Sequence, residues 1–202
     1  DYKRVTAGFN INPSLFDKHL NINVNGKYSY SKTNPGGQDA VGAAVSMDPT
    51  RPVKSSDEKF KNWGGYWQWA LPTTSYDPTF PYNRNNDAPT NPVEKVENYD
   101  FYKSAHILLG NVEADYKIHG FEDLHLHANI AGEYSTGGEY NTNNPQSTYG
   151  FYYGGNSENK EKKYNVVATA YAQYTKDFNK ANHFDIMAGY EYSHMKYWGD
   201  QW

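Results

Sequence analysis

The stretch that decides the fold is "LNINVNGKYSYS", residues 20–31, in which apolar and polar side chains alternate. Asparagine, lysine and serine occupy one side of an extended chain, and the other side holds Leu20, Ile22, Val24, Tyr28 and Tyr30. A period of two predicts a β-strand, because successive side chains of a strand point to opposite faces. The apolar side then needs a neighbour, which is either a protein core or the hydrocarbon of a membrane.

Five further stretches alternate in the same way, and each has one face without Asp, Glu, Lys or Arg. They are residues 5–11, 108–118, 124–134, 166–174 and 184–192. Because 21% of the chain is charged, six uncharged faces indicate selection against charge. A basic side chain that faces lipid at mid-bilayer costs about 2–4 kcal/mol, which would produce such selection. The sequence predicts an all-β fold of about six antiparallel strands in three hairpins.

The lengths of the connections favour lipid as the neighbour. Short connections are expected at "PSLFDKH", "HGFED" and "KDFNKANH", whereas residues 32–103 and 135–163 form long ones. Short periplasmic turns that alternate with long extracellular loops are typical of outer-membrane barrels. A structureless connection of such length would be unusual inside a compact soluble domain. We therefore expect part of a large transmembrane β-barrel.

Aromatic residues mark both ends of the apolar faces. Near the short connections these faces carry Tyr116, Tyr174 and Phe184, and near the long ones Tyr28, Tyr30, Tyr134, Tyr190 and Tyr192. Between the two groups lie mostly valine, alanine, glycine and isoleucine. Aromatic girdles on either side of an aliphatic band are typical of the two membrane interfaces. The core of a β-sandwich would more readily place its largest rings centrally.

Composition excludes several other classes. The chain has no cysteine, so a disulfide scaffold and a thiolate metal site are ruled out. The net charge of −4 gives no reason to expect nucleic acid as a partner. Six strands are too few to close a barrel, for which about eight are needed. We expect the missing strands to come from a longer chain or from other copies.

The first long connection has internal structure of its own. "QDAVGAAVSMDPTRPV" predicts a helix over residues 40–47, with Asp39 as its cap and Pro49 after its end. The aromatic segment "NWGGYWQW" follows. Our candidates for contact with a substrate or a lid protein are Trp63, Tyr66, Trp67, Trp69 and Arg84. The alternative for the four rings is that they pack the loop against itself.

Weaker motifs do not support a catalytic or metal-binding function. His125 and His127 share a strand face, but no third ligand is fixed by their spacing. The carboxylates at Glu113, Asp115, Glu133, Asp185 and Glu191 have no partner arrangement that pairs an acid with a nucleophile. Residues 83–91 lack the acidic pattern of a calcium loop and favour turns. We expect no catalytic residue, no metal and no cofactor.

Several of these segments, in this order, resemble one known family. Residues 1–33 resemble a strand–turn–strand pair of the SusC/RagA-type TonB-dependent outer-membrane transporters. "AVGAAVSMDPTRPV", "GGYWQW" and "NPVEKVE" are similar to that family's first large extracellular excursion. "GNVEADYKIHGFEDLHLHANIAGEY" and "HFDIMAGYEYSH" are similar to the strands that follow. The resemblance covers essentially the whole chain.

The resemblance implies a fold, a function and a set of partners. Family members are barrels of about 22 strands filled by an N-terminal plug. They import glycans, oligosaccharides or peptides across the outer membrane of Bacteroidetes-type bacteria. Their partners are a SusD-like surface lipoprotein that acts as a lid, TonB at the plug, and the outer-membrane lipid. On this basis residues 1–202 are a partial barrel wall with extracellular loops at 32–103 and 135–163, without a plug domain.

A rival interpretation is a secreted or surface β-sandwich that binds carbohydrate through its aromatic loop. That protein would cover its apolar face with a second sheet. A transporter segment would leave the same face bare for lipid.

Overall fold

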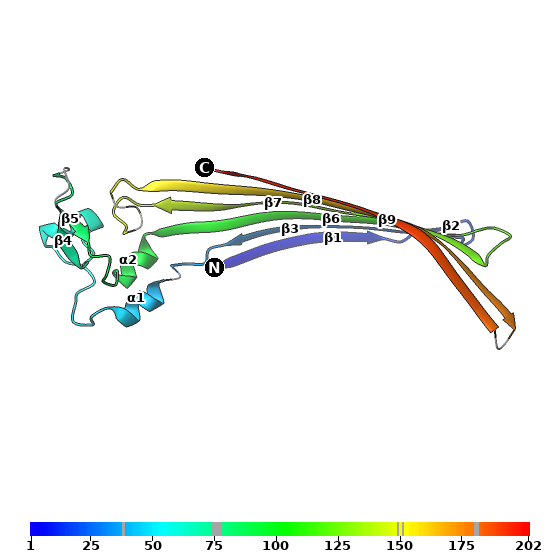
Figure 1. Cartoon of the computed structure of the whole chain (residues 1–202), viewed down its shortest axis with the longest axis horizontal. Coiled ribbons are helices and arrows are strands. Elements are labelled where there is room, and N and C mark those ends of the chain that lie inside the picture. Colours follow the sequence, from blue (N-terminus) through cyan, green and yellow to red (C-terminus); the bar gives the residue numbers. More distant parts are fainter. Residues whose placement is uncertain (38, 74–77, 149, 151, 180–181) are drawn as a thin grey trace.

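The computed structural model describes residues 1–37, 39–73, 78–148, 150, 152–179 and 182–202. Its elements are β1 (Tyr2–Ile11), β2 (Ser14–Leu15), β3 (Leu20–Thr33), α1 (Ala40–Ser46), the 3-10 helix η1 (Glu58–Trp63), β4 (Ala70–Pro72), β5 (Tyr82–Arg84), α2 (Pro92–Glu97), β6 (Tyr99–Lys117), β7 (Leu124–Asn143), β8 (Gly155–Asn179) and β9 (Asn182–Gln201). The long strands form one curved sheet, and the helices with β4 and β5 gather at one of its ends (Figure 1). Among the described helices, none has the length and apolar character to cross a membrane.

The sheet follows chain order. Its strands run β1-β3-β6-β7-β8-β9, every neighbouring pair is antiparallel, and the short β2 pairs with β3. This confirms the predicted set of six antiparallel strands in three hairpins. The sheet does not close on itself, because β1 and β9 lie at its two edges.

Strand register places all six apolar faces on the same side of the sheet, which we name the outer face. In one row across the strands, Val24 pairs with Val112, Val112 with Ile130 and Ile130 with Ala168. Val112 and Ile130 in this row are 49% and 60% exposed, and Val24 and Ala168 are partly exposed. The only other sheet of the described residues is the two-stranded β4-β5, so no second sheet covers the outer face. This single uncovered sheet is the arrangement expected of a barrel wall and differs from the one expected of a β-sandwich.

The opposite side, the inner face, is polar. His127 lies 3.7 Å from carboxylate oxygens of both Glu113 and Asp115 and stacks on the ring of Tyr171 at 4.4 Å. Lys163 lies 3.4 Å from Glu133 on the neighbouring strand. In the described part of the chain, no group of three or more His, Asp or Glu could hold a metal ion. A face of this composition suits contact with water or with polar protein.

The predicted boundaries of the long connections are too wide. The structure reduces them to residues 34–98 and 144–154, because β7 continues to Asn143 and β8 begins at Gly155. The prediction of a loop over 135–163 ended the strands where the apolar alternation ends. Backbone pairing continues beyond that point, since a hairpin with two hydrated faces needs no apolar side.

Two of the short turns contact each other. Phe16, Asp17 and Lys18 bend the first connection with positive φ angles of 52°, 52° and 69°. The ring of His19 then stacks on that of His119 at 3.8 Å and lies 3.2 Å from a carboxylate oxygen of Glu122. The carbonyl of Phe16 and then Glu122 raise the pKa of His19. The third short connection contains residues 180–181, which lie outside the described part.

Candidate functional site

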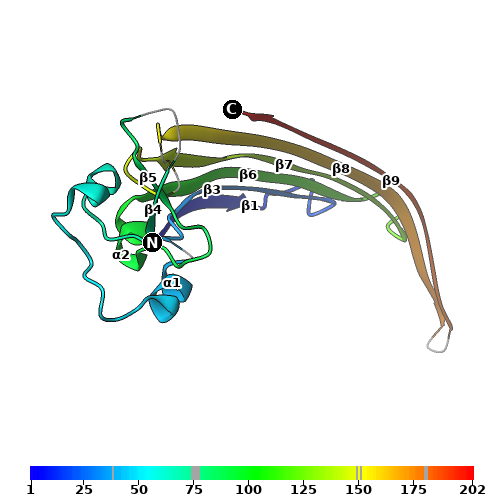
Figure 2. The same ribbon diagram turned by 60° about the vertical axis from the view of Figure 1, so that its left-hand side comes forward.

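The described residues of 39–98 form a lobe beside the sheet end that carries the long connections (Figure 2). Helix α1 spans Ala40–Ser46, which agrees with the predicted 40–47, and it buries Ala40 and Ala43. Asp39 is the N-cap residue, as predicted, but its side chain makes no capping hydrogen bond. Its carboxylate instead lies 3.5 Å from Nζ of Lys95, and this ion pair attaches α1 to α2.

The lobe has an aromatic core. Trp63 is 0% exposed, Phe60 1% and Tyr66 5%. After η1 the chain turns through Gly64 and Gly65, whose φ angles are 61° and 82°. Glycine adopts such angles without steric cost. Trp63 and Tyr66, two of the predicted ligand contacts, are thus interior residues of the lobe in this structure.

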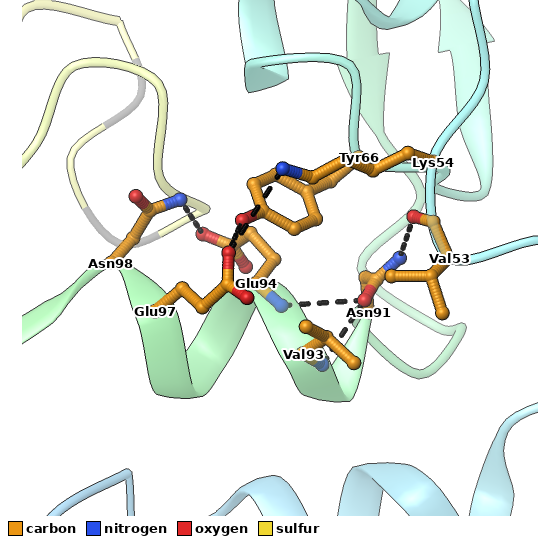
Figure 3. Close-up of polar contacts among 8 residues, drawn as sticks. All are labelled: Val53, Lys54, Tyr66, Asn91, Val93, Glu94, Glu97 and Asn98. Carbon is orange, nitrogen blue, oxygen red and sulfur yellow. Dashed lines mark hydrogen bonds and ion pairs between the residues drawn. The ribbon is translucent and has the colours of Figure 1, made fainter.

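Tyr66 is held by charged groups at the edge of this core. Its hydroxyl donates a hydrogen bond to the carboxylate of Glu97, and Nζ of Lys54 lies 4.3 Å from the ring centroid (Figure 3). Burial, and then the hydrogen bond to Glu97, raise the pKa of Tyr66. The phenol therefore keeps its proton and acts as a donor.

A buried asparagine joins three segments of the lobe. The side-chain nitrogen of Asn91 donates to the carbonyls of Val53 at 2.7 Å and Trp67 at 3.1 Å. Its side-chain oxygen accepts from the backbone N–H groups of Val93 and Glu94 and so caps α2 (Figure 3). Asn followed by Pro is a typical helix start, so the segment "NPVEKVE" carried a usable signal. Asn91 was not among the residues that the sequence indicated as functional.

Glu94 ties the lobe to the second long connection. It is 0% exposed, and its two carboxylate oxygens accept hydrogen bonds from the backbone N–H and the hydroxyl of Thr148, each at 2.9 Å. Asn98 donates a further bond at 3.4 Å. The connection that contains Thr148 joins β7 to β8, so Glu94 fixes the lobe to that hairpin.

We expect Glu94→Ala to loosen the attachment between the lobe and residues 144–154. It leaves the Thr148 donors without acceptors, at a cost of about 1–3 kcal/mol. Limited proteolysis of this connection would measure the effect as faster cleavage. Glu94→Gln is the matched control, because an amide oxygen can still accept from the Thr148 N–H while its nitrogen donates to the hydroxyl. Equal cleavage rates for Glu94→Ala and the parent protein would contradict this role.

The other two tryptophans of the lobe are partly exposed and lie beneath an arginine. Trp67 and Trp69 meet edge to face at 4.9 Å, and the guanidinium of Arg51 lies 5.3 Å from each ring. Asp48 accepts a hydrogen bond from Arg51 at 3.2 Å. Cation–π contacts of this kind hold the rings in fixed orientations.

Arg84, the remaining predicted contact, lines a hollow of about 650 Å³ between α1 and the chain that follows β5. Four charged side chains border it, namely Asp39, Arg84, Asp87 and Lys95. The Arg84 guanidinium donates a hydrogen bond to Asn86 at 3.0 Å. We name this hollow the charged groove. The structure thus separates the five predicted contacts, since Trp63 and Tyr66 form the core and Arg84 borders the groove.

The eight predicted girdle residues all lie on the strands of the main sheet. Tyr28 and Tyr134 share a row with Leu108 and with Tyr164, which the sequence analysis missed. Tyr164 belongs to the alternating pattern of β8, and extending that pattern by one further pair would have found it. The assignment of these rings to membrane interfaces stays a prediction.

One curved antiparallel sheet with an apolar outer face and a polar inner face defines this chain as a section of a transmembrane β-barrel wall. The chain is 39% identical, over 197 residues, to the TonB-dependent receptor SusC of Bacteroides thetaiotaomicron. The match covers 96% of this chain. The chain therefore belongs to the SusC/RagA type of TonB-dependent receptors, and its strands are those of an outer-membrane barrel.

Solved structures show the same fold. The chain aligns with the RagAB peptide transporter at a TM-score of 0.62, and with the RagAB peptide importer in its open-open and closed-closed states at 0.59 each. Identity is 13%, and each match covers 99% of this chain but 21% of the solved one. The chain spans 20% of the length of SusC. No family model matches the chain.

Proposed function

We propose that this chain is part of a receptor that imports oligosaccharides or peptides across the outer membrane with energy supplied through TonB. The observation that carries the proposal is the 39% identity to SusC along 96% of the chain. The RagAB structures, described as a peptide importer, support the same class of function. The remaining strands and the plug that contacts TonB are contributed by sequence beyond the matched fifth. This transport involves no covalent chemistry.

The proposal places the long connections outside the cell and the short turns in the periplasm. Short periplasmic turns and long external loops are the usual arrangement of outer-membrane barrels. The outer face then meets lipid along the six strands, and the polar inner face meets the barrel interior. The lobe of residues 39–98 stands at the external mouth of the barrel, together with residues 144–154.

Within the lobe, the charged groove is the proposed contact for the substrate or for a SusD-like lipoprotein lid. Arg84 and Asp87 provide donors and acceptors beside the Asp39–Lys95 ion pair. Trp67 and Trp69 supply partly exposed rings on the same lobe. Both an oligosaccharide and a peptide present polar groups that such side chains can bind. Trp63 and Tyr66 belong to the buried core of the lobe and support this surface.

Uptake by whole cells tests the proposal. We expect Arg84→Ala in the intact receptor to lower substrate uptake or lid association about tenfold, since a hydrogen bond to a charged group contributes about 1.5–3 kcal/mol. Lys61→Ala is the matched control, because Lys61 is 77% exposed on η1 and lies outside the groove. Equal losses in both variants, or no loss in either, would contradict the assignment of the groove.

A further inference from the structure

Lysines lie on the outer face near the end with the long connections, in three neighbouring rows of the sheet. Lys3 and Lys32 share a row, Lys162 lies in the next row toward mid-sheet, and Lys196 lies in the row after that. Following each strand from mid-sheet toward that end, the first formally charged side chain on the outer face is Lys3 in β1, Lys32 in β3, Lys162 in β8 and Lys196 in β9. We name these four residues the lysine rim. In β6 the first is Asp100, and the outer face of β7 carries none.

On β1, β8 and β9 the carboxylates of this face come later than the lysines. Asp1, Glu158 and Asp200 all lie farther toward the long connections than the lysine of the same strand. Some local pairing exists, since Asp1 lies 3.8 Å from Lys3, and Glu158 lies 2.8 Å from Lys160. Lys3 and Asp1 are 77% and 70% exposed, so water and salt screen their attraction strongly.

Two lysines of the rim are directly opposed. Lys3 and Lys32 are cross-strand partners in the β1–β3 pair. Like charges in directly opposite positions destabilise a sheet. An anion between the two ammonium groups would convert this repulsion into attraction. In the described part of the chain no ion pair is found for the other two members, Lys162 and Lys196, and Nζ of Lys196 lies 5.4 Å from the ring centroid of Trp198.

The rim adjoins aromatic rings that face the same side. Tyr30 precedes Lys32 by two residues, Tyr164 follows Lys162 by two, and Nζ of Lys32 lies 4.2 Å from the ring centroid of Tyr102. Tyrosine rings prefer the headgroup level of a membrane. Lysines immediately beyond them would then reach the charged part of the headgroups, where each contributes about 1 kcal/mol of attraction to anionic lipid.

We infer that the lysine rim binds the phosphate groups of a lipid in the leaflet next to the long connections. The inference rests on the proposed function in one respect, because it uses the orientation that places those connections outside. Phosphate is the anion that lysine ammonium groups commonly bind, and phosphorylated headgroups present it at this depth. Because β6 and β7 separate β3 from β8, one such lipid would bind at Lys3 and Lys32 and a second at Lys162 and Lys196.

The test measures binding of lipid A with both phosphates to the intact receptor in detergent micelles, with dephosphorylated lipid A as the comparison. The outer variant combines Lys3→Gln, Lys32→Gln, Lys162→Gln and Lys196→Gln. We expect it to lose affinity for the phosphorylated lipid by at least about tenfold. The dephosphorylated lipid should bind parent and variant alike, and added salt should weaken only the phosphate-dependent part.

Two further variants keep the test decisive. The inner variant removes four lysines of the inner face, in Lys27→Gln, Lys103→Gln, Lys117→Gln and Lys163→Gln. It takes away the same charge as the outer variant and should leave lipid affinity unchanged. Arginine at the four rim positions should retain binding. Equal losses in the outer and inner variants, or equal affinity for both lipids, would overturn the inference. Binding in micelles requires no uptake, so this result and the Arg84→Ala uptake result can fail independently.

Discussion

Arginine at position 128 is expected to destabilise the receptor strongly, whereas arginine at position 131 is expected to be tolerated. Ala128 lies on the exposed outer face of β7, where its neighbours in register are Ala114 and Ala170. A guanidinium there would stand in hydrocarbon. The expected cost is about 2–4 kcal/mol in the free energy of unfolding. Urea titration of the intact receptor in phospholipid vesicles would measure it.

Ala131 provides the matched control, because the same substitution on the same strand then points inward. Its neighbours in register are Asn111 and Val167, and Glu133 lies two residues along the same face. Arginine can pair with that carboxylate or remain hydrated. A result in which Ala131→Arg costs as much as Ala128→Arg, or more, would show that the two faces have been assigned the wrong way round.

Trp63→Ala is expected to unfold the lobe. The side chain is fully buried, and removal of a buried tryptophan costs about 3–5 kcal/mol through lost contacts and the cavity that remains. Limited proteolysis within residues 39–98 should become much faster. The strands, whose backbone pairs with neighbouring strands, should stay protected. One digest would thus measure the protease resistance of the barrel strands and of the lobe separately.

Trp69→Ala is the control for this experiment, because Trp69 is only partly buried. Its loss should change protease resistance less than the loss of Trp63, while ligand binding could still fall. The opposite pattern is informative. If Trp63→Ala abolished ligand binding but left the lobe resistant to protease, Trp63 would be a ligand contact, and its burial here would describe a closed state of the lobe.

The strands could be predicted well from the sequence, because the alternation of apolar and polar residues in a membrane strand is a local pattern. Alternation in "LNINVNGKYSYS" depends on two faces with different solvents, and the register confirms the assignment residue by residue. The extension of β7 and β8 beyond the apolar band could not be predicted in this way. There both faces are polar, so the side chains no longer report whether the backbone is paired.

The interior of the lobe could be predicted less well from the sequence. Asn91 contacts Gln68 across 23 residues of sequence, and Glu94 contacts Thr148 across 54, so no short pattern predicts these contacts. Four aromatic residues within seven positions indicated an important segment. They did not reveal which rings would be interior, because that depends on where η1 and α2 pack. Trp63 and Arg84 therefore looked equivalent in sequence and differ in structure.

The link between Glu94 and Thr148 has a mechanical consequence. The lobe is continuous with β3 and β6 through the backbone, and this link adds a third attachment at the tip of the β7–β8 hairpin. A body held at three points can tilt only if one of its supports bends. A molecule that docks on the lobe and pushes against it would therefore also push on the projecting β7–β8 hairpin. The hairpin would bend where its strands enter the membrane.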